Sequence, residues 1–198
     1  MFQRRLLTLT SLILVTILAI ARLPRVVITT LLMSLSPRFR TAPQALTFIY
    51  GFLVHEWSGL ARFLFVSVRY RKGEHLDRNR SIQFWWAQHL FDMGKRLYKL
   101  RIEVTGTEAL EGNCALLLSR HSSMGDTVLP LLFFGKARAE GLRYVLKQEL
   151  RYLPCLDIGG HRLPNVFVDR SGTDSAKAVK EVSNLIATAG EDESVLIY

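Results

Sequence analysis

The stretch CALLLSRHSSMGDTVLPLLFF, residues 114–134, decides how the second half of this chain folds. Residues 114–118 form a continuous apolar run, which is typical of a strand buried on both faces of a sheet. Residues 126–134 are apolar enough to favour a helix, and the segment between them is short and polar. A buried strand that leads directly into a helix indicates an α/β fold.

Other segments of this half extend the same alternation of strand and helix. Residues 102–104 alternate apolar and charged side chains, which predicts a strand before a turn at 105–107. Short apolar runs predict three more strands at 144–146, 166–168 and 194–198. We therefore predict an α/β fold with a mostly parallel sheet and flanking helices.

One further helix is predicted between the last two strands. Ser171 or Thr173 can cap its start, and Gly190 ends it. Its apolar positions step by three or four residues and are Ala176, Val179, Val182, Ile186 and Ala189. The sequence stops inside the strand that follows, whereas domains usually end in exposed segments, so we expect it to be incomplete at its C-terminus.

The positive charge of the chain lies in its N-terminal third. The formal net charge is +9, and residues 1–72 hold ten basic residues and one acid, Glu56. Residues 73–198 hold sixteen of each sign. A basic, apolar segment before a charge-balanced one is typical of a membrane-embedded region before a globular domain. Nucleic acid is not an expected partner, because these arginines are interleaved with runs of leucine, isoleucine and valine.

Three apolar runs, residues 6–21, 26–37 and 42–54, make up this membrane-embedded region. The first is sixteen residues without a charge, and as a helix it would extend ~24 Å against a hydrocarbon core of ~30 Å. Two short helices that enter one leaflet and fold back at Pro24 fit this length, and so does one tilted span. A signal peptide that ends near residue 21 competes with both, although the chain stays apolar beyond that point.

The chain thus divides into three predicted parts. Residues 1–72 are the membrane-embedded helical region, residues 73–101 an amphipathic connecting helix, and residues 102–198 the α/β domain. Arginines flank the first apolar run on both sides and so set no orientation. The two cysteines, Cys114 and Cys155, are expected to be reduced, because their number does not indicate a secreted disulfide framework.

The chemistry is expected where the strand at 114–118 ends. His121 and Asp126 follow it, separated by small residues and a glycine that permit a tight loop. A carboxylate on one ring nitrogen fixes the tautomer of a histidine and favours the imidazolium that forms when the other nitrogen takes a proton. The structural alternative is that Asp126 only caps the next helix. Metal binding is disfavoured, because two ligands have no third nearby.

The segment SRHSSMGDTVLP, residues 119–130, resembles the first motif, H-x4-D, of the glycerolipid acyltransferases. Residues 145–150, VLKQEL, with Pro154 after them, resemble the lysine–glutamate–leucine stretch of that family. Residues 167–170, FVDR, resemble its second motif, which ends in an arginine. The resemblance covers residues 100–198, and the third motif of the family would start just beyond Tyr198. Arg120 stands where the family often has asparagine.

The resemblance implies a role for each matched residue. His121 would act as the general base on a lipid hydroxyl, and Asp126 would orient it. Arg170 would bind the phosphate of the acceptor, because a guanidinium offers paired hydrogen bonds that match phosphate geometry. Lys147 would be a second substrate-binding residue. The structural alternative for Arg170 is an ion pair with a neighbouring aspartate.

The expected activity is transfer of a fatty acyl group from acyl-CoA or acyl-carrier protein to a lysophosphatidic acid-like acceptor, in phospholipid biosynthesis. The donor is a substrate, and no cofactor or metal is expected. The partners are membrane lipids and the thioester donor, and the sequence sets no oligomeric state. The expected location is the cytoplasmic membrane, with the site facing the cytoplasm. Another lyso-lipid acceptor and a non-catalytic membrane adaptor are the alternatives.

Overall fold

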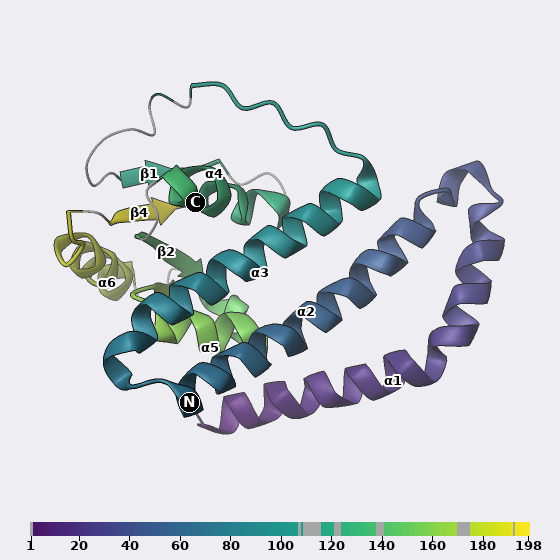
Figure 1. The fold of residues 1–198 in the computed structure, drawn as a ribbon, viewed down its shortest axis with the longest axis horizontal. Coiled ribbons are helices and arrows are strands. Elements are labelled where there is room, and N and C mark those ends of the chain that lie inside the picture. Colours follow the sequence, from purple (N-terminus) through teal and green to yellow (C-terminus); the bar gives the residue numbers. More distant parts are fainter. Residues whose placement is uncertain are drawn as a thin grey trace.

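The structure is a computed structural model, and most of the chain can be described from it. The described residues are 2–106, 108, 116–120, 124–137, 141–169, 175–191 and 193–198. Long helices from the N-terminal half lie beside a small sheet that carries shorter helices (Figure 1). Residues with predicted roles that lie outside the described ranges are His121, Arg170, the candidate helix caps Ser171 and Thr173, and Cys114.

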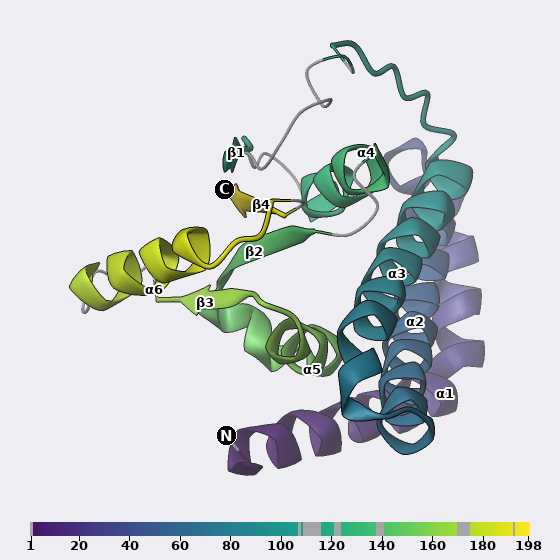
Figure 2. The ribbon, with the colours of Figure 1, turned by 60° about the vertical axis from the view of Figure 1, so that its left-hand side comes forward.

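Long helices form the N-terminal half. They are α1 (Phe2–Ser34), α2 (Ala42–Arg69) and α3 (His75–Tyr98), joined through short 3-10 turns η1 (Pro37–Phe39) and η2 (Lys72–Glu74). Figures 1 and 2 show the three lying side by side. The Tyr50 hydroxyl of α2 donates to the Ala19 carbonyl of α1 at 2.8 Å, and the Trp57 indole donates to the Thr16 hydroxyl at 2.9 Å. These bonds hold α2 against α1.

The first helix does not fold back at Pro24, which was one of the two arrangements that the sequence left open. Pro24 lies inside α1, and the chain reverses only beyond Ser34. A proline inside a helix removes one hydrogen bond and bends the helix without always ending it, and Figure 1 shows α1 bent along its length. Among the described helices, only α1 is long and apolar enough to cross a membrane. Just 6% of its most apolar window is buried, so most of that surface has no protein partner.

The sheet confirms the predicted α/β class. Its strands are β1 (Leu116–Leu118), β2 (Leu142–Lys147), β3 (Val166–Val168) and β4 (Ser194–Ile197), in the order β1-β4-β2-β3. All three neighbouring pairs are parallel, with Leu116 opposite Val195 and Val145 opposite Val166. The strand expected at residues 102–104 is wrong, because residues 101–106 have no regular structure.

The exposure of β1 is a second correction. The sequence predicted a strand buried on both faces, but Leu116 is 51% exposed and Leu118 is 77% exposed. In the described sheet, β1 lies at one end of the strand order and pairs only with β4. Leu116 and Leu118 lie outside the core that α6 (Ser175–Ala187) forms with β2, β3 and β4, and the apolar run alone does not reveal which strands that core includes.

Shorter helices cover the two faces of the sheet. They are α4 (Leu129–Ala137), α5 (Pro154–Arg162) and α6 (Ser175–Ala187), with 3-10 turns η4 (Met124–Thr127) and η5 (Gln148–Tyr152). Because strand side chains alternate between faces, Leu142 and Tyr144 pack towards α3 and α4, while Val145 packs towards α6. Figure 2 shows α6 and α4 on different sides of β2 and β4.

Helix α6 follows its predicted pattern only in part. Leu185 is buried and Val182 packs beside it, but Val179 is 66% exposed and Ile186 is 43% exposed. The helix ends at Ala187, before Gly190. The apolar positions chosen from the sequence therefore lie partly on the solvent side of the face that packs on the sheet.

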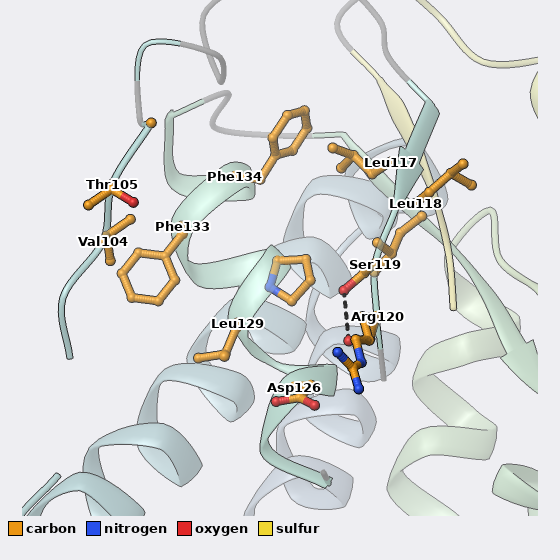
Figure 3. Close-up of a pocket in the computed structure, with 13 residues that line it drawn as sticks. Val104, Thr105, Leu117, Leu118, Ser119, Arg120, Asp126, Leu129, Phe133 and Phe134 are labelled. Atoms are coloured by element: carbon orange, nitrogen blue, oxygen red, sulfur yellow. Dashed lines mark hydrogen bonds between the residues drawn. The ribbon is translucent and has the colours of Figure 1, made fainter. Parts of the chain in front are cut away.

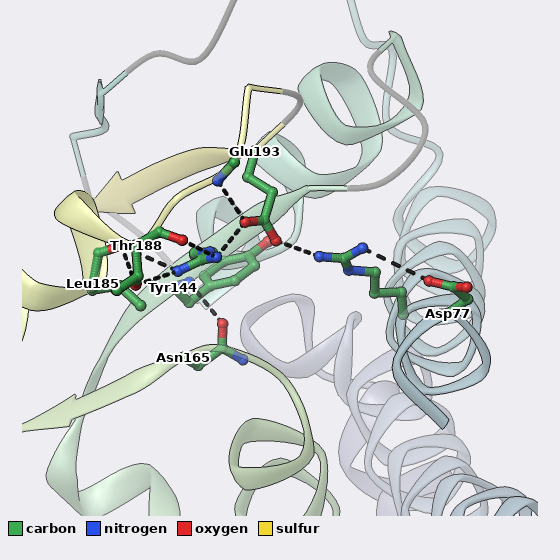
Figure 4. Close-up of polar contacts among 9 residues, drawn as sticks. Asp77, Tyr144, Asn165, Leu185, Thr188 and Glu193 are labelled. Atoms are coloured by element: carbon green, nitrogen blue, oxygen red, sulfur yellow. Dashed lines mark hydrogen bonds and ion pairs between the residues drawn. The ribbon is translucent and has the colours of Figure 1, made fainter. Parts of the chain in front are cut away.

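Two glutamate-centred contacts join the helices to the sheet and to one another. Glu193, just before β4, accepts hydrogen bonds from Arg80 of α3 and Arg143 of β2 (Figure 4). Arg143 is buried and also donates to the Thr188 carbonyl at 2.7 Å. Burial alone would raise the pKa of Glu193, but the hydrogen bonds and positive charges around it lower that pKa below its usual value. This ion cluster fixes α3 to the sheet.

The second contact joins α2 to α5. Glu56 is buried in α2, and its Oε2 accepts the Cys155 backbone N–H at 3.1 Å, at the positive N-terminal end of α5. The two helices approach closely because Gly59 has no side chain: a Cβ there would lie 2.4 Å from the Cys155 Sγ. Cys155 is a free, buried thiol, in line with the reduced state expected for it.

Burial raises the pKa of Glu56 to about 7, although the Cys155 N–H acts in the opposite direction. Between its ordinary value of 4.5 and about 7, the folded chain therefore holds a proton that the unfolded chain has released. Stability should fall as pH rises through this window. From pH 5 to pH 8, the free energy of unfolding of the parent should fall by up to about 3 kcal/mol relative to that of Glu56→Gln.

Urea unfolding of the full-length parent and variant in detergent micelles at the two pH values measures this difference. The measurement at pH 5 is the control, because Glu56 of the folded parent is then neutral, as the glutamine of the variant is at every pH. Parallel pH profiles for the two proteins would show that Glu56 ionises as freely in the folded chain as in the unfolded one.

Candidate functional site

The carboxyl ends of the four described strands meet at one edge of the sheet, because every pair is parallel. Ligands of open α/β sheets bind outside this edge. Strand β1 lies at one end of the order and β3 at the other, so their ends are separated by three strand spacings, ~14 Å. His121 follows β1 in the sequence and Arg170 follows β3.

A cavity of about 440 Å³ opens beside the end of β1 (Figure 3). It lies between residues 104–106, which have no regular structure, β1 and the start of α4. Most of its lining is apolar, with Ser119, Arg120 and Asp126 as polar groups on one side. The lining residues are Val104, Thr105, Gly106, Leu117, Leu118, Ser119, Arg120, Asp126, Leu129, Pro130, Phe133, Phe134 and Leu196.

Asp126 is the predicted catalytic residue that the structure describes, and it lies in the wall of this cavity. It belongs to η4, the 3-10 turn that carries the chain from β1 into α4. The Val128 N–H donates to the Gly125 carbonyl at 3.2 Å and closes that turn. The predicted helix at 126–134 therefore begins as a 3-10 turn, and this turn places the carboxylate beside the end of β1 (Figure 3).

Lys147 lies at the same edge but outside the lining of the cavity. It is the last residue of β2, and it is paired in register with Val168, the last residue of β3. Its ammonium group lies 3.6 Å from the Glu149 carboxylate, and both side chains are more than half exposed. The strand register thus puts Lys147 next to the strand that leads to Arg170, while its role in binding substrate stays a prediction.

Tyr198 is a residue of this site that the sequence did not point to. Its hydroxyl donates to the Thr127 carbonyl at 3.0 Å and to the Asp126 carbonyl at 3.3 Å. Burial, and then the nearby Asp126 charge, raise the pKa of Tyr198, so the hydroxyl remains a donor at neutral pH. A tyrosine at the end of an apolar strand carries no sequence signal for this role, because its partners lie on an element far away in the chain.

Removing this hydroxyl should loosen η4. We expect Tyr198→Phe to lower the free energy of unfolding by about 1 kcal/mol, because the Asp126 and Thr127 carbonyls lose a shared donor. Denaturant unfolding of the full-length protein measures the loss. Tyr152→Phe is the matched control, since Tyr152 is 65% exposed. Equal stability of both variants would show that the hydroxyl does not hold the turn.

Within the described ranges, no three histidine, cysteine, aspartate or glutamate side chains gather as ligands for a metal ion. The polar side chains at the cavity offer hydrogen bonds and charge of both signs, and they are Thr105, Ser119, Arg120 and Asp126. Such a lining suits a long apolar ligand whose polar end lies near the carboxylate.

Comparison with known proteins finds a family model that matches the second half of the chain. Residues 101–198 match the family model described as Acyltransferase. Searches of curated proteins and of solved structures found no match. The matched residues include the four described strands, the cavity lining and Asp126.

Proposed function

The chain belongs to the glycerolipid acyltransferase family through residues 101–198, and on that premise we propose that it acylates a lysophosphatidic acid-like lipid at a membrane surface. The observation that carries the proposal is the position of Asp126 in the wall of an apolar cavity at the carboxyl edge of the sheet. An acyl chain needs an apolar cavity, and the reacting groups need a polar end to it.

The proposed reaction uses the H-x4-D residues directly on the substrates. His121 takes the proton of the acceptor hydroxyl, and the oxygen attacks the carbonyl carbon of the acyl thioester. The carbon–sulfur bond then breaks, and the leaving thiolate takes the proton back from the imidazolium. Asp126 fixes the tautomer of His121 and stabilises its positive charge. The products are the acylated lipid and the free thiol of CoA or of the carrier protein.

The acceptor phosphate is assigned to Arg170, and Lys147 adds positive charge at the same edge. The ends of β1 and β3 are ~14 Å apart, a gap that a long arginine side chain and a lipid headgroup can bridge together. The exposed apolar surface of α1 supports a membrane location for the enzyme, because such surface is costly in water. The cytoplasmic membrane, with the site facing the cytoplasm, is the location we propose.

Product analysis tests this function. The full-length protein in micelles is given acyl-CoA or acyl-carrier protein together with equal amounts of lysophosphatidic acid, lysophosphatidylcholine and lysophosphatidylglycerol. We expect phosphatidic acid as the main product by mass spectrometry, and the two donor reactions identify the thioester. Preferential acylation of another lysolipid would replace the acceptor assignment. Absence of turnover with every pair would favour a membrane adaptor that keeps the fold.

A further inference from the structure

A cluster of positive side chains surrounds one buried carboxylate at the N-terminal end of α1. Asp157 of α5 is fully buried, and its carboxylate accepts hydrogen bonds from Arg4 at 2.7 Å and Arg5 at 2.8 Å. The Nδ1 of His161 lies 3.1 Å from the same carboxylate. Figure 2 shows the start of α1 near α5, away from β1 and α4. This cluster is therefore separate from the candidate active site.

The positive charge of the cluster exceeds its negative charge. Arg4 also donates to the Arg151 carbonyl at 3.2 Å, which places η5 against α1. Arg162 completes the group and donates to the Phe63 carbonyl at 2.7 Å. Burial, and then the nearby Arg5 charge, lower the pKa of Arg162. Two guanidinium groups and one imidazole thus contact the Asp157 carboxylate, the Arg162 charge lies near Arg5, and Glu149, an acid close in sequence, lies by Lys147 instead.

Several donors of the cluster remain unused in the described part of the chain. Arg5 bonds Asp157 only through Nε, and Arg151 bonds the Gln148 carbonyl only through Nε, so the terminal nitrogens of both have no hydrogen bond there. His161 uses Nδ1 towards Asp157 and leaves Nε2. Arg151 and His161 both lie against the Phe167 ring, at 5.8 and 4.8 Å from its centroid. The partly exposed donors are therefore linked by shared neighbours: Arg5 and His161 through Asp157, and His161 and Arg151 through Phe167.

The residues around the arginines indicate where an anion would come from. Phe2, Leu6 and Leu7 flank Arg4 and Arg5 on α1 and are 79%, 53% and 67% exposed. Apolar side chains exposed beside arginines are typical of a helix end at the boundary between hydrocarbon and headgroups. A guanidinium there meets lipid phosphates, which it binds through paired hydrogen bonds.

We propose that Arg5, Arg151 and His161 form a binding site for the phosphate group of an anionic membrane lipid, built on the buried Asp157 that fixes Arg4 and Arg5 against α5. The site is distinct from the acceptor site assigned to Arg170, and it requires no turnover. A bound lipid would join α1 to η5 and α5, and so hold the α/β domain at the membrane surface in one orientation.

Lipid titration tests the site. The full-length protein in dodecyl maltoside micelles is titrated with phosphatidylglycerol, with phosphatidylcholine and with inorganic phosphate, and its thermal unfolding midpoint is followed. We expect phosphatidylglycerol to raise the midpoint, because a ligand that binds only the folded chain stabilises it. The other two should leave the midpoint unchanged at the same concentration.

The test variant is Arg5→Lys with Arg151→Gln. Lysine keeps the charge beside Asp157, while the spare donors are lost, so the variant should fold and bind phosphatidylglycerol about fivefold more weakly. Arg96→Lys with Lys99→Gln makes the same charge change at the exposed end of α3 and should bind as the parent does. Equal affinity of parent and test variant would overturn the site, and an equal shift with inorganic phosphate would overturn the lipid as its ligand.

Discussion

Replacing His121 with alanine is expected to lower kcat/KM for acyl transfer by about a thousandfold, within the range that a general base contributes. Without the imidazole, the lipid hydroxyl has to lose its proton to water, and the cavity beside Asp126 then supplies binding and orientation alone. Steady-state rates with the preferred donor and acceptor of the full-length protein measure the loss. The variant should unfold at the same denaturant concentration as the parent.

Two further variants distinguish the loss of a catalytic group from a general effect of the substitution on the structure. Asp126→Asn keeps the size of the side chain and removes its charge, so it should also lower kcat strongly with little change in KM. His89→Ala is the control, because His89 is an exposed histidine on α3 whose Nδ1 contacts only its own helix at the Trp85 carbonyl. Full activity of His121→Ala would remove this residue from the reaction.

The second large effect concerns stability. Replacing Arg4 and Arg5 together with methionine should lower the free energy of unfolding by about 3–5 kcal/mol, as expected when a buried ion pair loses one partner. Asp157 is fully buried, and among the described residues His161 would be its one remaining ion-pair partner. Methionine keeps most of the apolar stem, so the change acts mainly on charge. Urea unfolding in micelles measures the loss.

Two comparisons show whether the loss comes from the uncompensated carboxylate. Arg22→Met with Arg25→Met makes the same change at exposed positions of α1 and should alter stability by less than about 0.5 kcal/mol. Adding Asp157→Asn to the Arg4 and Arg5 double variant removes the buried charge and should restore part of the stability. A double variant as stable as its exposed control would mean that α1 is not anchored to α5 through these ions.

Much of the sheet could be predicted because three of its strands show as local apolar runs in the sequence. The strands at 144–146, 166–168 and 194–198 are short apolar runs between polar turns, and the structure has strands at all three. The order of the strands is not local. Among the described strands, β1 is the one that adds no residue to the core under α6, and the run at 114–118 looks the same whether or not a helix covers it.

In the N-terminal half, too, local sequence patterns do not reveal contacts between distant segments. Pro24 and Glu56 look like breaks in the apolar runs, yet α1 passes through Pro24 and α2 passes through Glu56. Helix α2 tolerates its acid because α5 offers the Cys155 N–H at its N-terminus. That partner lies about a hundred residues away in the sequence, so no local pattern predicts the contact.

The residues of the candidate site also differ in whether a local sequence pattern reveals them. Asp126 was found because H-x4-D is a motif of adjacent residues, and the structure places its carboxylate in the wall of a cavity. Tyr198 acts through contacts with a distant segment and belongs to no motif, and the same holds for Asp157 in the separate cluster at the start of α1. Residues 104–106, predicted as the end of a strand and the start of a turn, have no regular structure and line the cavity.

The pairing of His121 with Asp126 can be measured directly by nitrogen NMR of the histidine rings in the full-length protein. The His121 signal is assigned by its loss in His121→Ala. We expect a neutral ring protonated at Nδ1, hydrogen-bonded to a carboxylate, with a bare Nε2, and a large shift of the Nδ1 signal in Asp126→Asn. A His121 ring whose signals are the same in the parent and in Asp126→Asn would contradict the catalytic pair.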